Sequence, residues 1–134
     1  MPELDNTTFK ITAVNGSPAY VSKTNALIEE IVNQFSARIN ISATTVSVGE
    51  LLPELATLQP VVGGKLEAGL KNIADADFII AASPIYKGSY SGLFKHIFDL
   101  LDPAALAHKP VLLAATGGSQ RHTLALEHQF RPLF

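Results

Sequence analysis

Hydroxyl and amide side chains gather with glycines in three short segments of this sequence. The first runs from Asn15 to Asn25, the second from Ser83 to Gly92, and the third from Thr116 to His122. Hydroxyls, amides and backbone N–H groups donate hydrogen bonds to the oxygen atoms of a ligand. We therefore expect the chemistry of this chain to begin with the binding of a small molecule.

The first segment is suited to wrapping a phosphate, because its donors lie around the start of a predicted helix, where free N–H groups and the helix dipole favour an anion. The donors are Ser17, Ser22, Thr24 and Asn25, and Lys23 adds a positive charge. Alternatively, Ser22 or Thr24 only caps the helix. The segment lacks both G-x-G-x-x-G and G-x-x-x-x-G-K-T, so neither a dinucleotide Rossmann site nor a nucleotide triphosphatase is supported.

The second segment is expected to be a rigid loop that follows a buried strand. Pro84 fixes its own backbone and favours an extended conformation at Ser83, while Gly88 and Gly92 allow close approaches. The tyrosines of this segment offer stacking faces and hydroxyls. These features predict a wall for a flat aromatic ligand.

The third segment contains the pair Gly117 and Gly118, which lets a backbone approach a ligand closely. An ordinary flexible turn is the alternative explanation for such a pair. Three donor-rich segments after three successive strands would, however, meet at one edge of a parallel sheet and form one pocket there.

The elements that position these segments follow from the apolar pattern. Predicted strands cover Phe9 to Val14, Ile41 to Val48, Phe78 to Ala82 and Val111 to Ala115. Predicted helices cover Thr24 to about Ile39, Lys65 to Ala74, Ser91 to Leu101 and the residues from His122 onward, with a short helical turn between Glu50 and Pro60. Strands that are apolar throughout are typical of a parallel sheet covered on both faces, so we predict a doubly wound α/β fold.

Composition excludes several classes of protein. The 134 residues are 47% hydrophobic and carry a formal net charge of -2 without a run of Lys or Arg, which predicts one globular domain over residues 1–134 and neither a nucleic-acid nor a membrane partner. The chain has no cysteine, and its polar N-terminus does not resemble a signal peptide, so a cytoplasmic location is expected. The histidines lack the spacing of metal ligands, so no metal site is predicted; they are His96, His108, His122 and His128.

Three motifs together resemble the NAD(P)H-dependent FMN reductases of the flavodoxin-like fold. They are G-S-P-x-x-x-S-x-T-N from Gly16, S-P-I-Y-K-G-S-Y-S-G-L-F-K-H-I-F-D-L-L from Ser83, and A-T-G-G from Ala115. Within that family, the motifs are most similar to the reductase components of two-component alkanesulfonate monooxygenases. The resemblance covers Phe9 to Phe134 and implies a five-stranded parallel sheet in the order 2-1-3-4-5, with FMN at the three loops.

The resemblance also assigns roles to residues. Ser17, Ser22, Lys23, Thr24 and Asn25 would hold the FMN phosphate. Pro84, Ile85 and Tyr86 would lie along the isoalloxazine ring with Lys87 and Ser89 nearby, and Thr116, Gly117 and Gly118 would contact its polar edge. Relatives often carry arginine directly after the proline of the first motif, whereas Ala19 stands there in this chain. This difference leaves the phosphate affinity and the preference for NADPH open.

The resemblance further implies a fifth strand and a terminal helix beyond Phe134, so we expect a shortened chain that persists only if a partner chain covers the exposed edge. The resemblance also implies a homodimer or homotetramer. Some family members carry a one-residue π-insertion in the fourth helix that is used in tetramer packing, and His128 lies near that position. The alternative is that His128 is an ordinary polar surface residue.

The implied reaction needs no catalytic side chain. A nicotinamide would stack on FMN and pass hydride to its N5 atom, while the protein supplies position and hydrogen bonds. The reduced flavin would then leave for a flavin-dependent monooxygenase in the assimilation of sulfur from sulfonates. Two alternatives remain: a quinone, azo or chromate reductase with permanently bound FMN, and a non-catalytic flavodoxin-like carrier or fragment.

Overall fold

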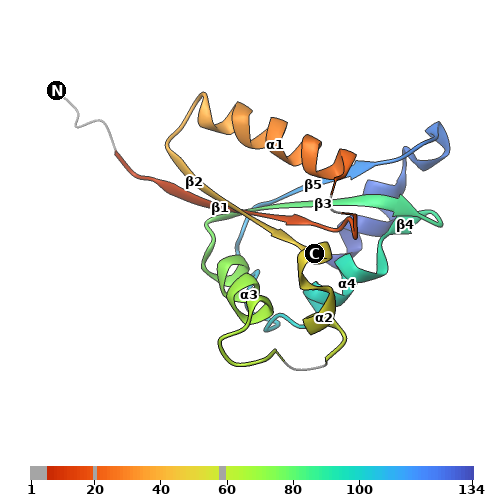
Figure 1. Cartoon of the computed structure of the whole chain (residues 1–134). Coiled ribbons are helices and arrows are strands. Elements are labelled where there is room, and N and C mark those ends of the chain that lie inside the picture. Colours follow the sequence, from red (N-terminus) through yellow and green to blue (C-terminus); the bar gives the residue numbers. More distant parts are fainter. Residues whose placement is uncertain (1–5, 20, 58–59) are drawn as a thin grey trace.

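The computed structural model describes residues 6–19, 21–57 and 60–134, and its elements alternate between strands and helices (Figure 1). Short helices that are not α-helical are labelled η. The elements are β1 (Phe9–Asn15), α1 (Lys23–Ser36), β2 (Ile41–Ser47), η1 (Val48–Leu51), α2 (Leu52–Leu55), α3 (Lys65–Asp75), β3 (Phe78–Tyr86), β4 (Ser89–Tyr90), α4 (Gly92–Asp99), β5 (Val111–Thr116), η2 (Gln120–His122), the π-helix η3 (Leu126–Phe130) and η4 (Arg131–Leu133).

Four strands form a parallel sheet in the order β2-β1-β3-β5, and the short β4 pairs antiparallel with β3. Val14 of β1 lies between Val46 of β2 and Ala81 of β3, and Ala82 of β3 pairs with Ala114 of β5. The predicted doubly wound α/β fold is confirmed. The strand order also agrees with the first four positions of the order that the resemblance implies.

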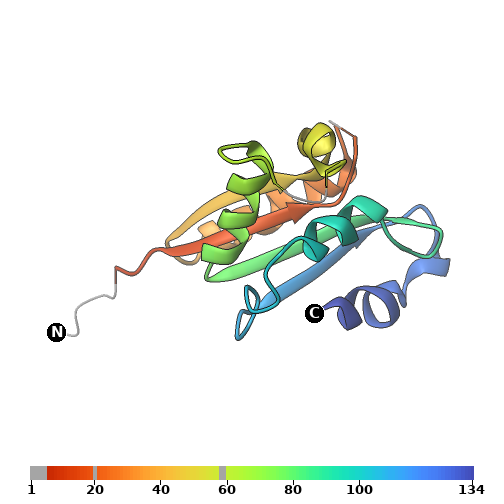
Figure 2. The same ribbon diagram turned by 90° about the horizontal axis from the view of Figure 1, so that it is seen from below.

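Helices cover both faces of the sheet. In Figure 1, α1 lies on one face, whereas α2, α3 and α4 lie on the other; Figure 2 shows this second face from below, with the C-terminal η3 and η4 beside α4. The core under α1 contains Ile11, Ala13, Ile28, Ile80, Ala82 and Ala114. The larger core on the opposite face includes Val14, Val46, Leu66, Ile73, Ile79, Phe94, Ile97 and Phe130.

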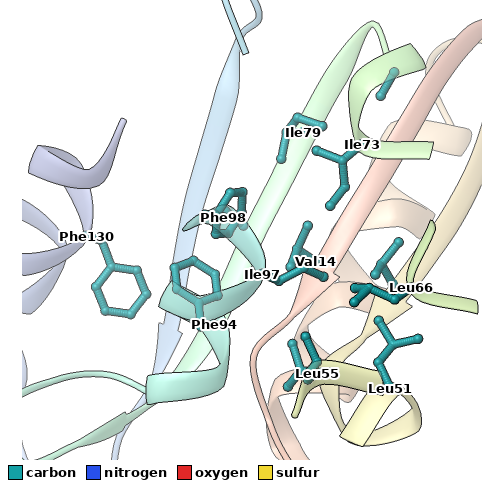
Figure 3. Packing of buried hydrophobic residues seen from close by; sticks show 14 of the residues in the cluster. Val14, Leu51, Leu55, Leu66, Ile73, Ile79, Phe94, Ile97, Phe98 and Phe130 are labelled. Atoms are coloured by element: carbon teal, nitrogen blue, oxygen red, sulfur yellow. The ribbon is translucent and has the colours of Figure 1, made fainter. Parts of the chain in front are cut away.

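The C-terminal segment joins this larger core through an aromatic cluster (Figure 3). The ring centroid of Phe130 lies 5.6 Å from that of Phe94 and 5.5 Å from that of Tyr90. Phe94 in turn lies 4.9 Å from Phe98, in an edge-to-face arrangement. Aromatic pairs at such distances stabilise a core beyond the area that they bury.

The loop predicted to begin at Ser83 is wrong in its first half, because β3 continues as a strand to Tyr86. Pro84 pairs in register with Thr116 of β5, so Ser83 is extended as expected. The chain then reverses at Lys87 and Gly88, whose φ angles are +54° and +79°. Two consecutive positive φ angles are typical of a type I′ hairpin turn, which here joins β3 to β4.

The helix boundaries also differ from the prediction. The first helix ends at Ser36 instead of Ile39, and Ser91 is the N-cap of α4, which ends at Asp99. The fourth predicted helix is broken into η2, the π-helix η3 and η4, so His122 ends a short 3₁₀-helix. The exposed His128 lies inside η3, which confirms the π-geometry that the resemblance implies at this position.

Side chains from distant parts of the sequence hold both ends of α3 in place. The carboxylate of Glu54 accepts hydrogen bonds from the first N–H groups of α3, those of Lys65 at 3.1 Å and Leu66 at 2.6 Å. At the other end of α3, the Lys109 ammonium donates to the carbonyls of Ile73 and Ala74. Part of the segment that precedes α3, residues 58 and 59, lies outside the described residues. Among the described residues, no helix is long and apolar enough to cross a membrane.

Candidate ligand-binding site

The first segment is bonded directly to β3 through Gly16. The Gly16 N–H donates to the carbonyl of Ala82 at 2.8 Å, and the Ser91 hydroxyl donates to the carbonyl of Gly16 at 2.5 Å. A side chain at Gly16 would have no room, because an added Cβ would lie 2.8 Å from the Cβ atoms of both Ser83 and Phe94. Glycine is therefore required here for a close approach of two backbones.

Ser83 and Ser91 hold the second segment in place. The Ser83 hydroxyl oxygen accepts from the Ser91 N–H at 2.9 Å, and the hydroxyl donates to the carbonyl of Pro84 at 2.8 Å. The Ser91 oxygen also accepts from the Phe94 N–H at 3.1 Å and so caps α4. Both serines are buried, and together with Gly16 they form a network that joins two of the three segments.

The first and third segments meet through a pair of hydroxyls. The oxygens of Thr24, at the start of α1, and Thr116, at the end of β5, lie 2.8 Å apart, and Thr24 is buried. The third segment also touches the second, since an added Cβ at Gly117 would lie 3.6 Å from Cδ1 of Ile85. The three segments therefore converge at the carboxyl edge of the sheet, as predicted.

Ser22 caps α1, because its hydroxyl oxygen accepts from the Asn25 N–H at 3.0 Å. The hydroxyl hydrogen of Ser22 is not used by this contact, so capping leaves it able to donate to a ligand. The Ser17 oxygen likewise only accepts, from the Ala19 N–H at 3.2 Å. The first N–H groups of α1, those of Lys23 and Thr24, have no partner within the helix. These donors suit an anionic group.

The other predicted site residues line the rim. Pro84, Ile85 and Ser89 are half-buried, and Tyr86 is 48% exposed. The remaining predicted residues, Lys23, Lys87, Gly117 and Gly118, are exposed. Within the first segment, Tyr20 lies outside the described residues. Half-buried apolar side chains beside exposed backbone donors can hold one face and one polar edge of a planar ring.

The first segment also borders a cleft of about 500 Å³ that opens toward β2. Its lining residues are Asn15, Pro18, Ala19, Val21, Ser22, Asn25, Ala26, Glu29, Ser47, Gly49 and Glu50. The interpretation of the sequence missed the part formed by Ser47, Gly49 and Glu50. The signal for it was available, since β2 neighbours β1 in this strand order and its carboxyl end must lie beside the first segment.

No group of three or more His, Asp or Glu side chains among the described residues is arranged to hold a metal ion. Nor does any described residue of the three segments bring a nucleophile beside a histidine within hydrogen-bond distance. The arrangement consists of hydrogen-bond donors, half-buried apolar side chains and a network of hydroxyl and backbone contacts that joins the segments. Its chemistry is therefore that of binding and orienting a ligand.

Comparison with known proteins gives one family over nearly the whole chain. The family model described as NADPH-dependent FMN reductase matches residues 9–134. The chain is 42% identical over 127 residues to the NADH-dependent FMN reductase SfnF of Pseudomonas fluorescens. This alignment covers 93% of the chain and 68% of that protein. It is 43% identical over 128 residues to an FMN reductase (NADPH) of Pseudomonas aeruginosa, covering 94% of the chain and 69% of that protein.

A solved structure agrees with this result. The apo form of the NADH:FMN oxidoreductase EMOB superimposes with a TM-score of 0.88 at 37% sequence identity. The match covers 93% of this chain and 67% of that protein. The family model spans residues 9–134, so the similarity to the family includes β1 to β5 and the three segments at their carboxyl ends.

Proposed function

Since this chain belongs to the NADPH-dependent FMN reductase family, we propose that its three segments hold FMN at the carboxyl edge of the sheet for reduction by NAD(P)H. The chain is an NAD(P)H-dependent oxidoreductase of flavin, and FMN and NAD(P)H are its small-molecule partners. When bound, FMN supplies the hydride-accepting chemistry. One hydride from NAD(P)H and one proton convert FMN to FMNH2.

The phosphate of FMN is assigned to the start of α1. The hydroxyls of Ser17 and Ser22 donate to it, together with the backbone N–H groups of Lys23 and Thr24. The Thr24 hydroxyl is already paired with Thr116, so this residue contributes through its backbone. Asn25 supports the site by donating its N–H to the capping oxygen of Ser22, and the Lys23 ammonium adds a positive charge.

The isoalloxazine ring is assigned to the space between the second and third segments. Pro84, Ile85 and Tyr86 provide the apolar wall, and Lys87 and Ser89 complete the hairpin beside it. The backbone of Thr116, Gly117 and Gly118 faces the polar edge of the ring. These groups orient the ring and exclude water from one of its faces, so the other face is left for the nicotinamide.

One observation carries this proposal: the three segments are bonded to one another, through Gly16 to Ala82 and Ser91 and through Thr24 to Thr116. These contacts hold the three segments together before any ligand arrives, which reduces the entropy cost of binding. The chain supplies position and hydrogen bonds, and no acidic or basic side chain is required in the transfer of hydride.

We further propose that the reduced flavin leaves and is consumed by a flavin-dependent monooxygenase in the assimilation of sulfur from sulfonates. The resemblance of the three motifs to reductases of such two-component systems supports this role. The proposal includes a cytoplasmic location and a homodimer or homotetramer. Sedimentation of a strictly monomeric species at micromolar concentration would contradict the oligomer.

The test is a titration of FMN into the apoprotein, followed by the quenching of flavin fluorescence. We expect saturable binding with a dissociation constant near micromolar, which corresponds to about 8 kcal/mol. Oxidation of NADH or NADPH should then require added FMN. FMN retained through purification would favour the alternative of a quinone, azo or chromate reductase, and nicotinamide oxidation independent of FMN would contradict the proposal.

A further inference from the structure

His122 is the last residue of the third segment, and the proposed function leaves it without a role. It ends the short helix η2, in which the N-cap Ser119 accepts from the Arg121 N–H at 3.2 Å. The His122 N–H in turn donates to the carbonyl of Ser119 at 3.3 Å. These two bonds turn the chain back on itself, so the side chain of His122 returns to the start of its own segment.

The imidazole of His122 lies against Gly117. A Cβ atom added at Gly117 would lie 3.4 Å from Cδ2 and 3.7 Å from Cβ of His122, and 3.6 Å from Cδ1 of Ile85. The side chains of His122 and Ile85 therefore meet beside Gly117. Gly117 and Ile85 are both proposed contacts of the flavin ring. The imidazole, which is half-buried, thus borders the space assigned to that ring.

The ring nitrogens of His122 are available to a ligand. Neither nitrogen has a hydrogen-bond partner among the residues that the structure describes. No described side-chain nitrogen that is sealed from solvent lacks a partner, so both nitrogens of His122 reach the solvent. A neutral imidazole donates one hydrogen bond and an imidazolium donates two. Nε2 is bonded to Cδ2, so it continues the edge of the imidazole that lies against Gly117.

The charges of the second and third segments favour an anion between them. Neither the run from Ser83 to Gly92 nor the run from Thr116 to His122 contains Asp or Glu, and each carries one cation, Lys87 or Arg121. One hydride from NAD(P)H adds one negative charge to the flavin ring, until a proton from the solvent neutralises it. A hydrogen-bond donor at this place would therefore act on a charge that grows during the reaction.

We propose that His122 donates a hydrogen bond to the polar edge of the bound flavin ring and stabilises the charge that arrives with the hydride. A donor that is already in position when charge develops lowers the barrier without further reorganisation. His122 acts here as a donor, so the transfer of hydride still needs no acidic or basic side chain. This inference rests on the proposed function and adds a residue to that same site.

The alternative is that His122 only packs against Gly117 and keeps the third segment in shape. Two substitutions separate packing from donation. His122→Phe keeps a planar ring beside Gly117 and removes the donor, whereas His122→Gln keeps a donor and removes the aromatic ring. His108→Gln is the matched control, because His108 is exposed and precedes β5, at the end of that strand opposite to the third segment.

The first measurement does not depend on turnover. Anaerobic calorimetry gives the dissociation constants of oxidised FMN and of FMN reduced with dithionite for the wild type and each variant. His122→Phe should weaken the binding of reduced FMN about tenfold more than that of oxidised FMN, which lowers the two-electron potential of bound FMN by about 30 mV. His122→Gln and the control should keep the ratio of the wild type.

Steady-state kinetics gives the second measurement. His122→Phe should lower kcat about tenfold and leave the KM for NADH and NADPH unchanged, because the contact strengthens only as charge develops. A His122→Phe protein in which both dissociation constants change by the same factor would overturn the proposal. So would a selective loss in His122→Gln equal to that in His122→Phe. A wild-type chain that binds neither form of FMN would instead refute the proposed function.

Discussion

The hydroxyl oxygens of Thr24 and Thr116 lie 2.8 Å apart, although 92 residues separate them in the sequence. The contact joins the first turn of α1 to the last residue of β5. It therefore fixes the distance between the proposed phosphate donors and the proposed contacts of the flavin ring. A ligand that reaches from the proposed phosphate donors to the proposed ring contacts therefore depends on this hydroxyl pair, even if it does not touch the pair.

Replacing either threonine by valine tests how much the hydroxyl contact contributes to stability apart from packing, because valine keeps the shape of the side chain and removes the hydroxyl. Thr24→Val and Thr116→Val should each lower the free energy of unfolding by about 1–2 kcal/mol, since the remaining hydroxyl loses its partner. The double variant should cost no more than one single variant. Urea unfolding of all four proteins measures this coupling, and strictly additive losses would contradict it.

Gly16→Ala should disrupt the site more than any other glycine substitution in the three segments. The added methyl group would lie 2.8 Å from the Cβ atoms of Ser83 and Phe94, so the backbone must shift. We expect a loss of about 1–3 kcal/mol in the free energy of unfolding and a weakened affinity for FMN. Gly92→Ala is the matched control, because no atom lies within 4 Å of its added Cβ and Gly92 is not among the proposed contacts of FMN.

Ser22 allows the capping role to be separated from phosphate binding. Ser22→Ala removes the cap and should cost about 1 kcal/mol of stability, whereas Ser22→Asp keeps an equally good capping group. Because the aspartate still caps α1, this variant should keep the thermal midpoint of the wild type. Its negative charge would lie beside the FMN phosphate, so FMN binding should be abolished. Tight FMN binding by Ser22→Asp would place the phosphate elsewhere.

Phe130 should contribute strongly to stability although it lies in the last turns of the chain. Its side chain is fully buried against Tyr90 and Phe94, so Phe130→Ala should cost about 3–5 kcal/mol. Phe134 is 41% exposed and contacts Phe94 and Phe98 at the edge of the same cluster. The loss for Phe134→Ala should be clearly smaller, and equal midpoints in denaturant for the two variants would contradict this assignment.

Asp75 provides a test of pH dependence on the surface. The hydrogen bond from Lys71 at 2.7 Å lowers the pKa of Asp75 below its ordinary value of 3.8. Its contribution is therefore present above pH 3.8 and is lost as the pH falls through the folded-state pKa. Both side chains are more than half exposed, so Asp75→Asn should barely change the urea midpoint at pH 7, and the difference should vanish in acid.

Much of the fold could be predicted from sequence because the central strands are covered on both faces. Ile79, Ile80 and Ala81 are fully buried, and such continuous apolar runs identify a parallel sheet without further information. The start of α1 is predicted to within one residue, at Thr24 instead of Lys23, because the capping signal at Ser22 is local. These elements depend on neighbours in sequence, which a pattern can contain.

The end of β3 could not be predicted in the same way. Pro84 lacks an N–H group and was therefore interpreted as part of a loop. The carbonyl of Ala82 faces β1, where it accepts from Gly16, and the nitrogen of Pro84, two residues later, faces the same side beyond the end of β1. Proline is tolerated in a strand where no partner needs its hydrogen, and only the register reveals this.

The contacts that close the site are also invisible in sequence. The bond from Ser91 to Gly16 spans 75 residues, and the cleft beside Glu50 exists only because β2 lies next to β1. Local patterns indicate which side chains of the three segments can donate hydrogen bonds, but they do not indicate which groups these side chains contact. The segments could thus be recognised as candidates, whereas the network among them required the tertiary structure.

A single hydroxyl, that of Ser91, accepts from the first turn of α4 and donates to the first ligand segment. Neither contact survives alone if Ser91 moves, so fraying of the helix start and opening of the pocket belong to one local unfolding event. Any ligand that holds the segment at Gly16 must then suppress that event as well. Occupancy of the pocket is thereby transmitted as slower amide hydrogen exchange at Phe94, a residue of the core.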